Sequence, residues 1–197
     1  MSQIYHIELK SSVSETVNLS DHIIHKLNMT PILDQESMLE ILVSVLLADG
    51  FAQNKSHERQ FTEMNQRHEQ VTFDLDRLEI KVELSEVKEV HTTVVAHHSY
   101  DKDFTNQDQA LVQAQKKLKA NEKLAHENLL EQAEKKQQKL TQKLNDNLAV
   151  QQLEFNEIMK QVYAESVKRK ARQLGDVMEV SESTENGQYE LVIKIEC

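Results

Sequence analysis

Residues 106–174 form a run of 69 residues without glycine or proline, and this run constrains the fold more than any other feature. It is dense in Gln, Lys, Glu, Leu and Ala, most of which are strong helix formers. As one helix it would extend about 100 Å. The whole chain has 3 glycines and 1 proline, so few tight turns are available and we expect long elements.

The apolar residues of this run lie on a narrow stripe. They follow a spacing of three or four residues: Leu111, Ala114, Leu118, Ala125, Leu129, Ala133, Leu140, Leu144 and Leu148. A stripe this thin is typical of a coiled-coil seam, whereas a helix lying on a core has a wider apolar face. We therefore expect it to pack along another helix.

Two arrangements would supply that partner helix. Asn145, Asp146 and Asn147 are the one cluster of turn-prone residues in the run, and a turn there would fold 106–144 against 148–174 as a hairpin. Alternatively, 106–174 is one straight helix that pairs between two chains as a homodimeric coiled coil. We favour the hairpin, because a straight helix would separate the β-rich segments on either side of it.

The first 105 residues predict a β-rich body with one helix. Residues 5–9 alternate apolar and polar side chains, residues 13–19 do so more weakly, and 20–29 is extended. A helix follows Pro31, with Asp34 as its N-cap and Gly50 at its end. Its apolar face comprises Met38, Leu39, Ile41, Leu42, Val45 and Leu46, and we expect this face to cover the sheet.

Residues 58–98 predict an antiparallel meander. Alternation is clean over 71–75 and 78–84, on either side of a tight turn near Asp76 and Arg77, and 87–98 is rich in β-branched residues. The stretch 54–69 is compatible with an edge strand or a short helix.

The C-terminal residues 175–197 predict a β-hairpin. Gly175 ends the helical run, and two alternating segments flank Asn186-Gly187, a strong two-residue hairpin signal. A lone hairpin is marginal in water, so we expect it to complete the body formed by 1–105. The resulting prediction is an α+β fold: an antiparallel β-sheet with a covering helix and a long inserted α-helical (coiled-coil) hairpin over 106–174.

The charge distribution limits the classes of partner. The net charge of -10 divides into -9 over 1–105, +4 over 106–175 and -5 over 176–197. Acidic β elements argue against nucleic-acid binding, which depends on neutralising phosphates. The longest apolar stretch, Ile41 to Ala48, is too short to span a membrane, and the first residues carry no signal-peptide pattern. We expect a cytoplasmic protein.

Catalytic chemistry finds no support in the sequence. The nine histidines are scattered, and His126-Glu127 lacks the second histidine of a zinc-protease motif. Three glycines cannot build phosphate-binding loops, and Cys197 is the only cysteine. We therefore predict no catalytic, cofactor-binding or metal-binding residues and no cofactor. An enzyme with an unrecognised site is the less favoured alternative.

Two stretches of the chain resemble a known family. The start, IYHIEL followed by SDHIIHKLNMTPILDQESMLEILVSVLLADGF, resembles the opening of the bacterial FtsH ternary system domain X proteins. The matching residues are Tyr5, Ile7, Glu8, Leu9, Asp21, Leu27, Pro31, Ile32, Leu33, Met38, Leu46, Gly50 and Phe51. The ending, a helix followed by Leu-Gly and a hairpin, is similar to that of small proteins of cyanobacteria and plastids. The long helical run is a departure from both.

The resemblance implies partners and carries no catalytic residues. Proteins of this family are expected to act beside an AAA+ ATPase and a von Willebrand A-type protein. We therefore expect a non-enzymatic scaffold or adaptor component of a bacterial multi-protein system, which docks partners through its helical arm. Self-association through 106–174, as a coiled-coil structural protein, is the alternative.

Overall fold

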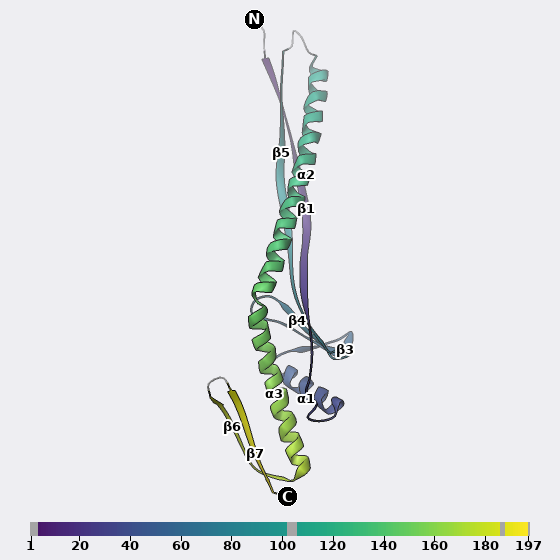
Figure 1. Ribbon diagram of the computed structural model, residues 1–197. Coiled ribbons are helices and arrows are strands. Elements are labelled where there is room, and N and C mark those ends of the chain that lie inside the picture. Colours follow the sequence, from purple (N-terminus) through teal and green to yellow (C-terminus); the bar gives the residue numbers. More distant parts are fainter. Residues whose placement is uncertain (1–3, 102–105, 186–187, 197) are drawn as a thin grey trace. The chain divides into compact units, whose positions relative to one another are not determined.

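The structure is a computed structural model that describes residues 4–101, 106–185 and 188–196 (Figure 1). Helices and antiparallel strands are both abundant, which confirms the α+β class. The elements in chain order are β1 (Ile4–Lys26), α1 (Gln35–Ala48), β2 (Ala52–Asn54), β3 (His57–Met64), β4 (Gln70–Asp74), β5 (Glu79–Asp101), α2 (Gln107–Asp146), α3 (Leu148–Leu174), β6 (Asp176–Glu185) and β7 (Gln188–Glu196). No helix of the described residues is both long and apolar enough to cross a membrane.

The strands of the described residues form two sheets. The larger has the order β1-β5-β4-β3-β2 and contains the predicted meander, with 57–64 as a strand. The alternation over 5–9 and the weaker alternation after it belong to one continuous strand, β1. Strands β6 and β7 form a separate two-stranded sheet.

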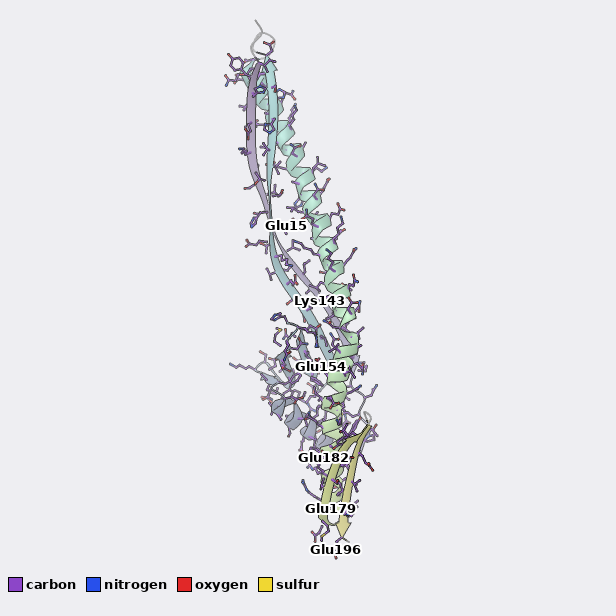
Figure 2. The ribbon with its side chains drawn as sticks, turned by 90° about the vertical axis from the view of Figure 1, so that its left-hand side faces the viewer. Glu15, Lys143, Glu154, Glu179, Glu182 and Glu196 are labelled. Carbon is purple, nitrogen blue, oxygen red and sulfur yellow. The ribbon has the colours of Figure 1, made fainter. Side chains whose placement is uncertain are left out.

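The C-terminal hairpin packs on helix α3, which supplies the second layer that a lone hairpin needs. Lys168 lies 2.6 Å from Glu182 of β6, and the ammonium of Lys160 lies 4.9 Å from the centre of the Tyr189 ring. Figure 2 shows Glu182 on the hairpin beside α3. The hairpin thus packs on the rest of the chain through α3 and adds no strand to the larger sheet.

The chain divides into two units, which we describe separately. The ribbon unit comprises Met1–Asp21 and Ser85–Lys143, and the core unit comprises His22–Leu84 and Leu144–Cys197. Each unit therefore contains part of β1, part of β5 and part of the helical run.

Helix α1 of the core unit begins and ends where the sequence predicts. The Asp34 carboxylate accepts a hydrogen bond of 2.9 Å from the Ser37 backbone N–H, which caps the first turn. Gly50 has a φ of 100°, in the left-handed region that favours glycine, and the Phe51 N–H then donates to the Leu46 carbonyl. The predicted N-cap and terminating glycine are confirmed.

An aromatic cluster fills the centre of the core unit. Phe73 of β4 is fully buried, and its ring lies 5.2 Å from that of Phe51 and 6.1 Å from that of Phe155 on α3, both in edge-to-face geometry. The other large buried side chains include those of the α1 face: Met38, Leu39, Ile41, Leu42, Val45 and Leu46. Helices α1 and α3 thus share one core with the sheet.

The predicted turn at 145–147 does not form, so the chain makes no helical hairpin there. Asn147 has φ -83° and ψ -6°, in the right-handed helical region, and it is the single residue between α2 and α3. The Gln151 N–H donates to the Asn147 carbonyl at 2.9 Å, so helical hydrogen bonding resumes at once. A reversal would require a break in this pattern.

A buried carboxylate holds the β3–β4 turn against the start of α3. Glu69 accepts hydrogen bonds from the side chains of Asn65 (2.8 Å), Arg67 (3.0 Å) and Asn147 (2.7 Å). Arg67 also donates two bonds to Glu154 of α3, at 2.8 and 2.7 Å. Burial raises the pKa of Glu69, but the hydrogen bonds outweigh it and leave that pKa below its usual value.

The ribbon unit pairs β1 with β5, and α2 runs alongside both strands (Figure 1). The Gln137 side chain donates to the Ser20 carbonyl at 2.9 Å, and Thr141 donates to the Asp21 carboxylate. His126 lies 3.6 Å from Glu15. Of the predicted stripe, Ala114, Leu129 and Leu140 are buried in this unit and Leu144 in the core unit, whereas Leu111 is exposed and the neighbouring Ala110 is buried in its place.

The partner of the stripe in the ribbon unit is a two-stranded β-ribbon, so the prediction of a partner helix is wrong there. The face of β5 with Val94 and Ala96 is buried, as is the stripe of α2. A ribbon two strands wide offers a narrow apolar surface, and a narrow helical stripe is enough to cover it. Periodicity alone could not distinguish a ribbon from a helix as the partner.

The Glu69 cluster generates a prediction for acid stability. Because the pKa of Glu69 is lower in the folded state, its stabilisation is present above the unfolded glutamate pKa of about 4.3 and is lost as the pH falls through the folded value. Glu69→Gln should reduce the free energy of unfolding at neutral pH by about 1–3 kcal/mol. Urea unfolding at several pH values should show a weaker loss of stability in acid than for the wild type. Glu58→Gln, at an exposed position, is the control and should lose stability in acid as the wild type does. If Glu69→Gln also lost as much stability in acid as the wild type, this role of Glu69 would be contradicted.

Adjacent leucines of α2 test its packing on the ribbon. Leu129 is 2% exposed and Leu130 is 46% exposed. Leu129→Ala should lower the free energy of unfolding by about 2–5 kcal/mol through the cavity it leaves. Leu130→Ala should change it by no more than about 0.5 kcal/mol. Equal losses in the two variants, measured by urea unfolding at matched protein concentration, would show that the stripe does not face the ribbon.

Candidate functional site

Strand β5 has a free edge in the ribbon unit. Between Glu79 and Glu83 it pairs with β4, but among the described residues no strand other than β1 pairs with its continuation from Ser85 onward. An unpaired strand edge presents a row of backbone donors and acceptors, which is a template for another strand.

The backbone pattern identifies which groups point to this edge. The Leu27 N–H donates to the Leu78 carbonyl at 2.8 Å, so the carbonyls of even-numbered β5 residues point to β1 and those of odd-numbered residues point away. The same register holds at the far end of the ribbon, where the rings of Tyr5 and Tyr100 stack. The Asn121 side chain of α2 confirms the parity, since it donates to the Val95 carbonyl at 3.0 Å.

Helix α2 overhangs the free edge and forms a groove with it. The groove has a volume of about 500 Å³. Its lining combines the strand with one face of the helix: Thr92, Thr93, Val94, Val95, Asn121, Leu124, Ala125, Asn128, Leu129, Glu131, Gln132 and Lys135. Leu124 is 57% exposed, so an apolar side chain stands open to solvent beside unpaired backbone groups.

The charges of the groove balance each other. Glu131 and Lys135 are its charged lining residues, and they pair at 2.6 Å one helical turn apart. This hydrogen bond from Lys135 lowers the pKa of Glu131. On β5, the hydrogen bond from Lys88 likewise lowers the pKa of Glu86, with smaller contributions from Lys143 and Lys136. The groove therefore suits an uncharged ligand segment.

The described histidines do not gather into a group that could hold a metal ion. His6 shares a hydrogen bond of 2.8 Å with Ser99, His126 lies near Glu15, and His97 is exposed whereas His98 is half-buried. In the part of the chain that the structure describes, no group of three or more His, Cys, Asp or Glu residues could hold a metal ion.

The groove itself was not predicted. The alternation over 87–98 indicates a strand, but whether an edge is free depends on the neighbouring strands in the sheet. The exposed Leu124 offered a weak signal, because it lies outside the three- or four-residue spacing of the stripe.

The comparisons with known proteins identify the family. The sequence model of FtsH ternary system domain X5 matches residues 1–197. The chain belongs to the FtsH ternary system domain X5 family. The comparison with curated proteins gives no match, and the comparison with solved structures gives none either.

Membership in the X5 family extends the resemblance that the sequence suggested. That resemblance rested on about the first 50 residues and the C-terminal hairpin, whereas the family match also includes α2 and the ribbon. The family description makes the chain a component of an FtsH ternary system, which implies protein partners. The long helical run is thus part of the family's sequence pattern.

Hydrogen exchange can test the free edge directly. In the free protein the Thr93 amide should exchange at least about tenfold faster than the amides of Thr92 and Val94, which point to β1. Amide exchange measured by NMR resolves each position. Equal protection at all three residues would mean that this edge is already paired.

Proposed function

We propose that this chain is a cytoplasmic, non-enzymatic adaptor of a bacterial FtsH ternary system, which works with an AAA+ ATPase and a von Willebrand A-type protein. The observation that carries the proposal is the family match over residues 1–197. A ternary system requires protein partners, and a small component without its own reaction can serve it by binding them.

The surface of the ribbon unit supports the docking role. The groove beside β5 combines unpaired backbone groups with the exposed Leu124, and its charged pair is internally neutralised. Strand edges and exposed apolar side chains are features of protein-binding sites. We therefore assign partner docking to α2 and the adjacent edge of β5.

The shifted carboxylates support a non-enzymatic role. The pKa of Glu182 is lowered by hydrogen bonds from Lys168 and Tyr189, and that of Glu69 is lowered within its buried network. Both groups join elements of the core unit to each other. Perturbed pKa values arise at structural ion pairs as well as at catalytic sites, and these carboxylates serve the first purpose.

Two leucines of α2 provide a matched test of docking. Leu124 lines the groove and Leu130 does not, although both are exposed. We expect an AAA+ ATPase or a von Willebrand A-type protein of the same system to bind this chain in biolayer interferometry. Leu124→Arg should weaken that binding by about tenfold or more, as expected for a central apolar contact. Leu130→Arg should leave the dissociation constant within about twofold, as expected for a position outside the contact.

The proposal has two points at which it can fail. If neither partner protein binds the wild-type chain, the adaptor role is wrong. If one binds but Leu130→Arg weakens it as much as Leu124→Arg does, docking takes place on another surface. Circular dichroism of both variants should match the wild type, since both side chains are exposed in the structure.

A further inference from the structure

We infer that the groove beside β5 binds a partner by strand addition, taking an extended, uncharged segment as an additional strand. This inference rests on the proposed function and specifies how the partner docks. The backbone of the added segment would hydrogen-bond to the edge of β5 around Thr93. Its side chains would pack on the face of α2 around Leu124.

The edge can hydrogen-bond an added strand in register. By the alternation of the ribbon, the backbone N–H and C=O groups of His91 and Thr93 point away from β1. Val95 points the same way, but Asn121 already donates to its carbonyl. The carbonyl bound by Asn121 therefore marks one end of the open segment, which continues from Thr93 toward His91 and Glu89.

The side chains define what the added strand must carry. In a strand, alternate residues face opposite sides of the sheet. On the α2 side, the added strand would meet Leu124, Ala125 and Asn128, which suit small or medium apolar residues. Because Glu131 and Lys135 neutralise each other, a charged residue there would find no unpaired opposite charge among the lining residues. The partner's segment should therefore alternate apolar and polar residues and carry no charge at its centre.

The overhang of α2 favours a single added strand over a second copy of this chain. Asn121 reaches the edge carbonyl from α2, so the helix lies over the edge of β5. Antiparallel pairing of two β5 edges would place both α2 helices on the same face of the joined sheet. Their overhanging parts would then occupy the same space. A partner that contributes one strand without a covering helix avoids this collision.

Proline substitutions at matched positions test the mode of binding. Thr93 points its N–H to the groove edge, and Thr16, on β1, points its N–H to the opposite edge of the same ribbon. Proline removes an N–H and is tolerated at strand edges. Thr93→Pro should raise the dissociation constant of the partner protein about tenfold, and Thr16→Pro should leave it within about twofold.

A synthetic peptide tests the edge without any partner protein. The probe is a capped eight-residue peptide with lysine at each end around three threonine–valine pairs. At about 1 mM, in the range of weak peptide affinities, it should slow amide exchange at His91 and Thr93 and shift their NMR signals. The amides of Ser14 and Thr16 should not change. The same peptide with proline in place of both its threonines and its valines should have no effect, because it has no backbone N–H donors between its lysines.

The outcomes separate the inference from the proposed function. If a partner protein binds and Thr93→Pro has no effect while the probe peptide leaves His91 and Thr93 unchanged, strand addition is wrong and the adaptor role stands. If no partner binds, the adaptor role is wrong, and the peptide alone decides whether the edge accepts a strand. Protection of Thr93 that rises with protein concentration, without any peptide, would mean that a second copy is the occupant and would overturn the inference.

Discussion

The packing of α2 on the β1–β5 ribbon is the interaction on which the ribbon unit depends. A two-stranded ribbon is marginally stable in water, and an isolated helix derives little stability from a narrow apolar stripe. Each element supplies the apolar partner that the other lacks. Leu129 and Ala114 of the helix are buried, as are Val94 and Ala96 of β5. The polar bond from Gln137 to the Ser20 carbonyl fixes the alignment at one end.

Features that depend on local sequence could be predicted, and features that depend on distant contacts could not. The helix from Asp34 to Gly50 follows from its cap and its glycine, and the meander follows from its alternation. The prediction of a turn at 145–147 was wrong because the Asn147 side chain donates a hydrogen bond to buried Glu69, which lies 78 residues away in the sequence. The prediction of a partner helix for the stripe was wrong for a similar reason. A helix and a narrow ribbon can both be covered by a narrow apolar stripe, so the stripe does not reveal which of them it contacts.

The free edge of β5 connects the fold to the proposed function. Family membership makes the chain a component of an FtsH ternary system and implies protein partners, but it does not indicate a surface. The structure adds an edge with unpaired backbone groups, the exposed Leu124 above it and a neutralised pair, Glu131 and Lys135. The same helix thus stabilises the ribbon with one face and forms a groove with another. The narrow stripe leaves the rest of the helix surface exposed, and we propose that partners dock there.

The central claim is that the stripe of α2 packs on the ribbon of its own chain, and isotope-filtered NOE spectroscopy tests it most directly. A sample that mixes labelled and unlabelled protein in equal amounts distinguishes contacts within a chain from contacts between chains. We predict NOEs from the methyl groups of Leu129 to those of Val94 and its neighbours on the ribbon, all within one chain. Intermolecular NOEs between α2 stripes, without contacts from Leu129 to the ribbon, would contradict the account and would indicate a coiled-coil dimer.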